Sequence, residues 1–276
     1  MAGRVKSLVK QVLKSAGYDV RRRENACFPY IRPVEIASLH FNFWIADVWG
    51  RLWYQEAFDD LRQEAEQLQL LVHPGDRVLE VGCHHGFFTM LLARVVGPTG
   101  FVCAVEASPE NAMIAQAQIT LNQVGGYVTV LHAAGGDCAG PLKVLSDNTG
   151  GNNHIITGDR VKFAEVQAVT GNDLDAKYGP FDFIKLDVEG FEANVLKGCT
   201  HILDRRPRVA IEIHCTDLPR YGSSVAEVLQ LLNSNDYQGF VVRRPTHALE
   251  PFGQGQIAGV EPVNLFLRPR CKRGSR

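Results

Sequence analysis

The sequence predicts an α/β protein with a mostly parallel β-sheet flanked by helices. From about residue 70 onward, short runs rich in β-branched residues alternate with helical patterns, which is typical of βαβ units. The chain has 276 residues, 45% of them hydrophobic, so it can bury a sizeable core without disulfides or metals. These two observations favour one α/β domain with an added segment.

Seven segments have the composition of strands and end at turn residues. They are residues 77–83, 101–107, 127–134, 181–190, 208–215, 239–244 and 263–269. Four segments between them show apolar residues at helical spacing. They are residues 87–96, 109–123, 190–203 and 223–234. Residues 136–160 are rich in Gly, Asn and Asp and are expected to form a loop of a length that is often functional.

Residues 1–70 differ from the rest of the chain. The first 20 residues have apolar positions at helical spacing interrupted by lysines, which predicts a basic amphipathic helix. An aromatic-rich stretch over 28–58 and a charged helical segment over 59–71 follow. We interpret residues 1–70 as a helical cap on the substrate side of a domain at 71–270, with simple packing onto the sheet as the alternative. Residues 271–276 form a basic tail.

Charge and cysteine content restrict the partners and the compartment. The 29 basic and 30 acidic residues nearly cancel, so nothing global indicates a nucleic acid partner. Seven scattered cysteines without a CxxC pair favour a reducing compartment. No apolar run reaches the ~20 residues that a membrane span needs. We therefore expect a cytoplasmic protein, with peripheral contact to an anionic membrane through the N-terminal helix as an option.

The turn after the first strand indicates a ligand site. Gly82 and Gly86 allow a sharp exit from the strand and a close approach of the next helix, so that backbone N–H groups can face a ligand. Glu80, just inside the strand end, is placed to receive an ammonium group. Glu106, at the end of the second strand, can accept both hydroxyls of a ribose. An amino-acid moiety joined to a ribose describes S-adenosylmethionine better than NAD.

A dinucleotide fingerprint, Gly-x-Gly-x-x-Gly, is not met at this turn. His84 and Phe87 occupy two of its three glycine positions. An NAD(P)-dependent oxidoreductase is therefore a weaker alternative. A cofactor-binding scaffold that has lost catalysis is the alternative from a different class.

Three blocks of the sequence carry a family resemblance. Residues 80–89 match an acid-x-Gly-x-Asn-x-Gly turn followed by an aromatic pair and Thr, except that His84 stands in place of Asn. Residues 105–122, VEASPENAMIAQAQITLN, match the helix after the second strand. Residues 183–198, FIKLDVEGFEANVLKG, match an Ile-Lys-x-Asp-x-Glu-Gly-x-Glu block almost residue for residue, and 209–214 match the Glu-x-His strand that follows. In these blocks the chain resembles the FkbM-type family of class I S-adenosylmethionine-dependent methyltransferases.

The resemblance covers about residues 70–270. It implies a Rossmann-like seven-stranded sheet whose last strand is antiparallel. It also implies methyl transfer to an oxygen, typically a hydroxyl of a sugar or a secondary metabolite. S-adenosylmethionine is the cofactor that we then expect. Its candidate contacts are Glu80, Gly82, Cys83, His84, Gly86, Phe87, Glu106, Ala107, Ser108, Asn111, Ala134 and Asp187.

The candidate catalytic residues are Asp187, Glu189 and His214. The fourth and fifth strands end beside the first in this topology, so these side chains are expected to converge near the sulfonium. His214 is the expected general base, because an imidazole titrates near neutrality, and Glu212 or Glu189 would orient it. In the alternative interpretation Asp187 anchors a loop or the cofactor, and Glu189 and Glu192 stabilise a helix N-terminus.

Metal binding is a less favoured alternative for the same cluster. Asp187, Glu189 and His214 could hold Mg²⁺ or another divalent ion together with substrate oxygens. A zinc site is less favoured still, because the spacing lacks the usual ligand pairs. Its ligands would be drawn from Cys83, His84, His85, His214 and Cys215. The expected partner is a small-molecule hydroxyl acceptor, whose identity has no readable code in the sequence.

Overall fold

The computed structural model describes residues 29–145, 163–243, 248–253, 257 and 262–271. The predicted N-terminal amphipathic helix, most of the predicted loop at 136–160 and nearly all of the basic tail lie outside these residues. None of the helices that the structure describes is both long enough and apolar enough to cross a bilayer.

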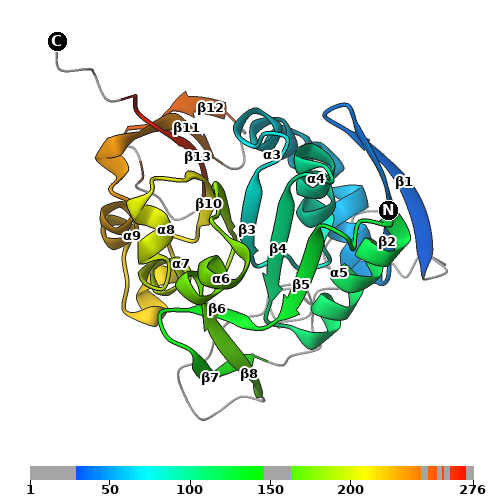
Figure 1. Cartoon of the computed structure of the whole chain (residues 1–276), viewed down its shortest axis with the longest axis horizontal. Helices are drawn as coiled ribbons and strands as arrows, with labels where there is room; N and C mark the ends of the chain where they lie inside the picture. The colour runs from blue at the N-terminus through cyan, green and yellow to red at the C-terminus, as the bar shows by residue number, and fades with distance from the viewer. Residues whose placement is uncertain (1–28, 146–162, 244–247, 254–256, 258–261, 272–276) are drawn as a thin grey trace, which may run out of the picture.

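An eight-stranded sheet forms the centre of the molecule, in the order β12-β11-β13-β10-β9-β3-β4-β5 (Figure 1). Five strands are mutually parallel. They are β3 (Arg77–Val81), β4 (Phe101–Glu106), β5 (Val128–His132), β9 (Phe183–Leu186) and β10 (Arg208–Ile213). The last strand, β13 (Val263–Pro269), is antiparallel to both β10 and β11 (Tyr237–Arg243). The predicted mostly parallel, Rossmann-like α/β fold is confirmed, with the seven predicted strands present.

One more strand extends the sheet at its edge. β12 (Ala248–Pro251) pairs with β11 and was not expected from the sequence. A strand of four residues is too short to show a recognisable alternation of apolar and polar side chains, and three of the four residues are exposed. The fourth predicted strand is also shorter than expected, because β9 ends at Leu186 and the chain then turns through positive φ at Glu189 and Gly190.

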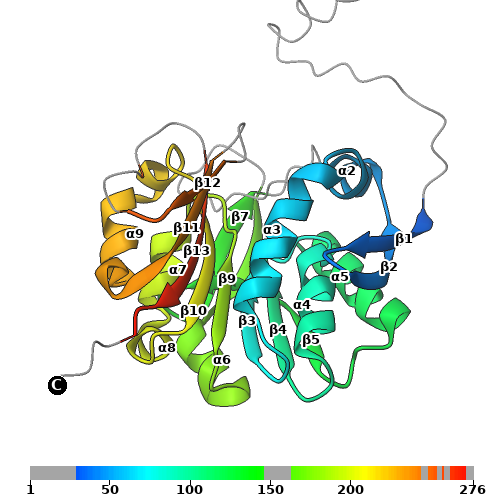
Figure 2. The ribbon, with the colours of Figure 1, turned by 90° about the horizontal axis from the view of Figure 1, so that it is seen from above.

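Helices cover both faces of the sheet (Figures 1 and 2). One face packs against α3 (Phe58–Leu71), α4 (Phe87–Val96) and α5 (Pro109–Asn122). The other packs against α6 (Gly171–Tyr178), α7 (Glu192–Lys197), α8 (Thr200–Asp204) and α9 (Val225–Leu231). Successive residues of β3 serve the two layers, since Val78 lies in one core and Leu79 in the other. Both are fully buried, as expected for a parallel sheet covered on both sides.

The helix expected over residues 190–203 is interrupted. α7 ends at Lys197, and α8 begins at Thr200. The break lies at Gly198, where an added Cβ would be 2.0 Å from the carbonyl oxygen of Gly136. The close approach of β6 to this point therefore requires glycine.

A small three-stranded sheet replaces part of the predicted loop at 136–160. Its strands are β6 (Ala134–Gly136), β7 (Gly140–Leu145) and β8 (Phe163–Thr170), in the order β6-β8-β7. β7 and β8 are antiparallel neighbours, and Ala134, Val144, Val166 and Ala168 form a small core between them. The Gly-rich composition concealed this pairing, because strands that bury few large side chains give a weak sequence signal.

The aromatic-rich stretch forms a β-hairpin, so the predicted helical cap is not confirmed. β1 (Tyr30–Ile36) and β2 (Leu39–Ile45) pair along their whole length, and α2 (Val48–Arg51) and a π-helix, η1 (Leu52–Glu56), follow. Gln118 of α5 ties the hairpin down: its amide donates to the Trp44 carbonyl and accepts from the Trp44 N–H, both at 2.9 Å. The hairpin thus lies against the helices of one face (Figure 2).

Candidate functional site

A cavity of about 420 Å³ opens at the carboxyl ends of the parallel strands. Its wall includes the ends of β3 and β4 and the residues that follow β9 and β10. β3 and β9 are neighbours, and the chain proceeds outward from them in opposite directions, through β4 to β5 and through β10 to β13. Ligands of doubly wound sheets bind at such a switch point, because the connections diverge there and leave a crevice.

The turn after β3 has the predicted shape. Gly82 has φ +87°, and a Cβ there would lie 1.7 Å from the carbonyl oxygen of Asp187. Gly86 has φ +80° and precedes α4, with Cα of Ala115 only 3.2 Å from an added Cβ. Both glycines are therefore required by conformation and by a close neighbour.

The N–H groups of this turn bind to the protein. Those of Gly82 and Cys83 donate to the Val105 carbonyl, and that of Gly86 donates to the Cys83 carbonyl. The His84 N–H donates to Glu106 at 2.7 Å. The expectation that these N–H groups face a ligand is therefore not met for these four residues, and the turn contributes shape and carboxylates to the cavity.

Glu80 is a fully buried carboxylate in the cavity wall. Its Oε2 accepts a hydrogen bond from Thr89 at 2.6 Å, whereas Oε1 has no hydrogen-bond partner among the described residues. Burial raises the pKa of Glu80 to about 7, against the opposing effects of Lys185 and of Thr89. A cationic ligand group beside Oε1 would favour ionised Glu80.

Glu106 joins the turns after β3 and β4. Its Oε2 accepts from the His84 N–H, and its Oε1 accepts from the Ser108 N–H at 2.9 Å. Burial raises the pKa of Glu106, although both backbone hydrogen bonds act against the rise. The Asn111 side chain also hydrogen-bonds this carboxylate, whose two oxygens together have four lone pairs, so an acceptor position remains for a ligand hydroxyl.

Nine of the twelve candidate cofactor residues line the cavity. They are Glu80, Gly82, Cys83, His84, Glu106, Ala107, Asn111, Ala134 and Asp187. Gly86, Phe87 and Ser108 are not among the lining residues. Phe87 is fully buried and stacks on Tyr54, while the Ser108 hydroxyl caps α5. These three residues shape the turns behind the cavity.

The N-terminal segment supplies four cavity residues. They are Trp53, Tyr54, Leu61 and Glu64. The first two come from the aromatic-rich stretch that we interpreted as a cap or as core, whereas Leu61 and Glu64 were not expected from the sequence. Tyr54 lies in the π-helix, and its hydroxyl is 2.6 Å from Nδ1 of His84. The Tyr54 ring also stacks on Phe87, with centroids 5.1 Å apart. Aromatic density was the available signal: the segment packs onto the core and part of it lines the cavity, and its role toward a substrate stays a prediction.

His84 and His85 have different surroundings. Their rings stack with centroids 4.1 Å apart, but only His84 lines the cavity. His85 is buried beside Asp47, with Nε2 3.9 Å from Oδ2, and burial lowers its pKa. The zinc alternative is not supported. Among the residues that the structure describes, the one group that could hold a metal ion contains His214 but none of the other four candidate zinc ligands, Cys83, His84, His85 and Cys215.

The structure brings Asp187, Glu189 and His214 together in the cavity wall. Nε2 of His214 is 3.2 Å from Oε2 of Glu189. Nδ1 is 2.8 Å from Oε1 of Glu192, a fully buried residue of α7. The carboxylate that orients His214 from behind is therefore Glu192, which the sequence interpretation had placed at the helix N-terminus.

The carboxylates around His214 determine its charge. Burial alone would lower its pKa, but the hydrogen bond to Glu192 and the charges of Glu189, Asp187 and Glu212 raise it to about 10. The surrounding carboxylates thus favour protonated His214. Burial also raises the pKa of Glu189 to about 8, against the opposing charge of His214, so these two groups compete for a proton and titrate as a pair.

The cavity wall is strongly acidic. Seven carboxylate side chains line it: Glu64, Glu80, Glu106, Asp187, Glu189, Glu212 and Asp217. Lys185 is the single lysine in this lining, and no arginine is among the lining residues that the structure describes. Burial would lower the pKa of Lys185, but Glu64 at 3.6 Å and Asp187 at 3.9 Å raise it above its usual value. Such a wall favours a cationic ligand over the pyrophosphate of NAD(P).

The comparisons with known proteins identify the family. The sequence profile of the FkbM methyltransferase domain matches residues 80–239, more than half of the chain. No curated protein matches the chain.

Solved structures are similar at low identity. An S-adenosylmethionine-dependent O-methyltransferase from Thermotoga maritima is 18% identical, with 88% of this chain and 79% of that chain covered and a TM-score of 0.43. An O-methyltransferase from Bacillus cereus, in complex with S-adenosylhomocysteine, is 16% identical, with 75% and 78% covered and a TM-score of 0.41. An rRNA methylase from Streptococcus thermophilus is 14% identical, with 76% and 95% covered and a TM-score of 0.44. The family profile includes the ends of β3, β4, β9 and β10, which build the cavity. Because it also matches more than half of the sequence, this chain belongs to the FkbM family of class I S-adenosylmethionine-dependent methyltransferases.

Proposed function

We propose that this methyltransferase transfers the methyl group of S-adenosylmethionine to a hydroxyl oxygen of a small molecule, such as a sugar or a secondary metabolite. The observation that supports this most is the acidic cavity at the switch point of the sheet. S-adenosylmethionine carries a sulfonium and an ammonium group, and carboxylates in a partly buried wall favour both charges. The aromatic Trp53 at the wall adds an apolar surface for an acceptor.

The cofactor would extend along the ends of β3 and β4. Oε1 of Glu80 is the proposed partner of the ammonium group, since it is buried and lacks a hydrogen bond among the described residues. The Glu106 carboxylate is the proposed acceptor for the ribose hydroxyls. Asn111 and Ala134, which also line the cavity, would contact the rest of the nucleoside.

Methyl transfer would take place beside Asp187, Glu189 and His214. The acceptor oxygen attacks the methyl carbon in line with the C–S bond, that bond breaks, and its electron pair stays on sulfur. Holding the two reactants in this alignment provides much of the acceleration. The hydroxyl proton would pass to the Glu189–His214 pair, whose carboxylate and imidazole are adjacent in the cavity wall. His214 would then hold Glu189 in place. Because burial raises the pKa of Glu189 to about 8, its carboxylate would accept the proton most readily above that pH.

Partner and compartment are further parts of the proposal. We propose a small-molecule acceptor in place of nucleic acid, because acidic side chains dominate the cavity. The six cysteines that the structure describes are free thiols, which supports a cytoplasmic location. Contact of residues 1–28 with a membrane surface stays a prediction.

Calorimetric titration of the full chain with S-adenosylhomocysteine, S-adenosylmethionine and NAD tests the cofactor assignment. We expect saturable binding of both sulfur nucleotides and none of NAD. Failure of the folded protein to bind either sulfur nucleotide would remove the basis of the proposed function.

A cell extract incubated with the enzyme and methyl-labelled cofactor tests the acceptor class. We expect label in small molecules, as methyl ethers stable to mild base. Label confined to protein or nucleic acid would contradict the hydroxyl acceptor, whereas cofactor binding with no labelled product in any fraction would favour the scaffold alternative.

A further inference from the structure

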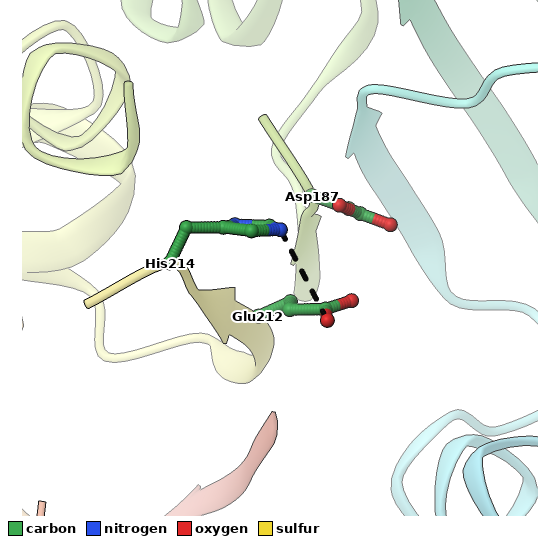
Figure 3. Close-up of side chains that lie close together, drawn as sticks. All are labelled: Asp187, Glu212 and His214. Atoms are coloured by element: carbon green, nitrogen blue, oxygen red, sulfur yellow. Dashed lines mark ion pairs between the residues drawn. The ribbon is translucent and has the colours of Figure 1, made fainter. Parts of the chain in front are cut away.

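Asp187, Glu212 and His214 form a group with the donor set of a divalent-cation site. One ligand atom from each lies within 4.8 Å of the other two. Ligand atoms with ~2.1 Å bonds to one ion lie about 3–4 Å apart, so the three side chains would move closer together around a bound ion. Figure 3 shows that the three side chains extend toward the same region from adjacent strand ends.

Neighbouring strands produce this convergence. Asp187 follows β9, Glu212 lies in β10, and His214 follows β10 directly. β9 and β10 are parallel and paired, with Leu186 opposite Ile211. All three side chains line the cavity. The trio differs from the metal set considered from the sequence, because Glu212 takes the place of Glu189.

A buried carboxylate outside the trio holds the His214 ring. Glu192, on α7, is fully buried, and its Oε1 lies 2.8 Å from Nδ1 of His214 and accepts the Gly190 N–H at 3.0 Å. This contact fixes the ring with Nε2 on the side of Glu189 and Glu212. Metal-binding histidines usually have a carboxylate or carbonyl on the second nitrogen, which sets the tautomer and the ring orientation.

Carboxylates outnumber cations around His214 in the described part of the chain, since Asp187, Glu189, Glu192 and Glu212 lie near a protonated His214 and Lys185. Asp187, Glu189 and Glu212 are grouped at the strand ends of the cavity wall, and fully buried Glu80 adds an Oε1 with no hydrogen bond in the described part of the chain. Lys185 contacts Asp187 but is shared with Glu64. Grouped carboxylates in a partly buried site repel one another, and a bound cation would relieve this repulsion.

We propose that Asp187, Glu212 and His214 bind a divalent cation of the Mn²⁺ class, which would displace the proton from Nε2 of His214. The two carboxylates suit Mn²⁺ and Mg²⁺ alike, and the imidazole disfavours Mg²⁺, which is bound by oxygen ligands. The role of the cation rests on the proposed function: it would coordinate the acceptor hydroxyl and favour its ionisation. The hydroxyl proton would go to Glu189, the oxygen would attack the methyl carbon, and the C–S bond would break with its electrons on sulfur.

Binding of Mn²⁺ to the full chain after chelator treatment tests this site. Free Mn²⁺ gives an electron paramagnetic resonance signal that disappears on binding, so the titration needs no acceptor. We expect one saturable site per chain. Glu212→Gln should weaken it at least tenfold, and Glu192→Gln should weaken it about 10–100-fold through the ring orientation. Asp217→Asn is the matched control, since Asp217 also lines the cavity but is outside the trio, and it should leave the affinity unchanged.

Circular dichroism and S-adenosylhomocysteine titration of the same samples separate a lost metal site from a lost fold. If Glu212→Gln fails to fold, Asp187→Asn replaces it in the comparison. Wild-type protein that binds S-adenosylhomocysteine but shows no saturable Mn²⁺ site would overturn the metal proposal and leave the proposed function intact. Equal weakening by Asp217→Asn and Glu212→Gln would also overturn it, because it would indicate diffuse attraction by an acidic cavity. Mn²⁺ binding without nucleotide binding would support the site and contradict the proposed function.

Discussion

Gly82→Ala should be strongly destabilising, because two independent effects coincide at this residue. Its φ of +87° disfavours an L side chain by ~1–2 kcal/mol. The added Cβ would lie 1.7 Å from the Asp187 carbonyl oxygen, which is main chain and cannot rotate away. Overpacking of this kind costs roughly 1–3 kcal/mol. The sum is about 2–5 kcal/mol, a large part of the ~5–15 kcal/mol by which a domain is stable.

Denaturant unfolding of Gly82→Ala beside Gly222→Ala separates the two effects. Gly222 also has positive φ, +70°, but nothing lies within 4 Å of an added Cβ. Gly222→Ala should therefore lose only the conformational ~1–2 kcal/mol. Gly82→Ala should lose more and should also weaken S-adenosylhomocysteine binding, since relief of the clash moves Asp187 in the cavity wall. Equal loss of stability in the two variants would refute the steric argument.

Two further predictions concern the cofactor end of the cavity. Because the pKa of Glu80 is raised to about 7, its carboxylate is mostly protonated at pH 6, and S-adenosylhomocysteine affinity should fall about tenfold per pH unit below 7. Calorimetry at pH 6 and 7.5 measures this change. The Glu80→Gln variant should lose the pH dependence. Stability without ligand has the opposite trend: the unfolded chain ionises Glu80 near 4.5, so this residue's contribution is complete below that pH and is lost as pH rises through 7. A flat affinity profile in wild type would contradict the ammonium assignment. Tyr54→Phe removes the hydrogen bond to His84 and should lower the free energy of unfolding by about 0.5–1.5 kcal/mol. The control is Tyr237→Phe, which should cost little because the Tyr237 hydroxyl is buried without a hydrogen bond among the described residues. Similar unfolding midpoints for the two variants would show that the Tyr54 contact is not stabilising.

Local patterns in the sequence were sufficient for the main elements of the fold. α4 was predicted over its full extent, 87–96, and β13 over 263–269, because buried periodic segments bounded by turn residues carry a strong signal. The break at Gly198 and the edge strand β12 were missed. The break at Gly198 depends on Gly136, a partner far away in the sequence. β12 pairs with its neighbour β11, and it was missed because it is short and mostly exposed.

Residues within short segments were sufficient to predict the fold class, the glycine turn after β3 and the acids at the strand ends. The distances between these groups came from the tertiary structure. It placed Glu192 behind His214, where the carboxylate raises the pKa of the imidazole, and it put Glu212 beside Asp187 and His214. It also linked Tyr54 to His84 across 30 residues. Charge, hydrogen bonding and ligand geometry depend on distances in space, and those distances are set by packing between elements that are remote in the chain.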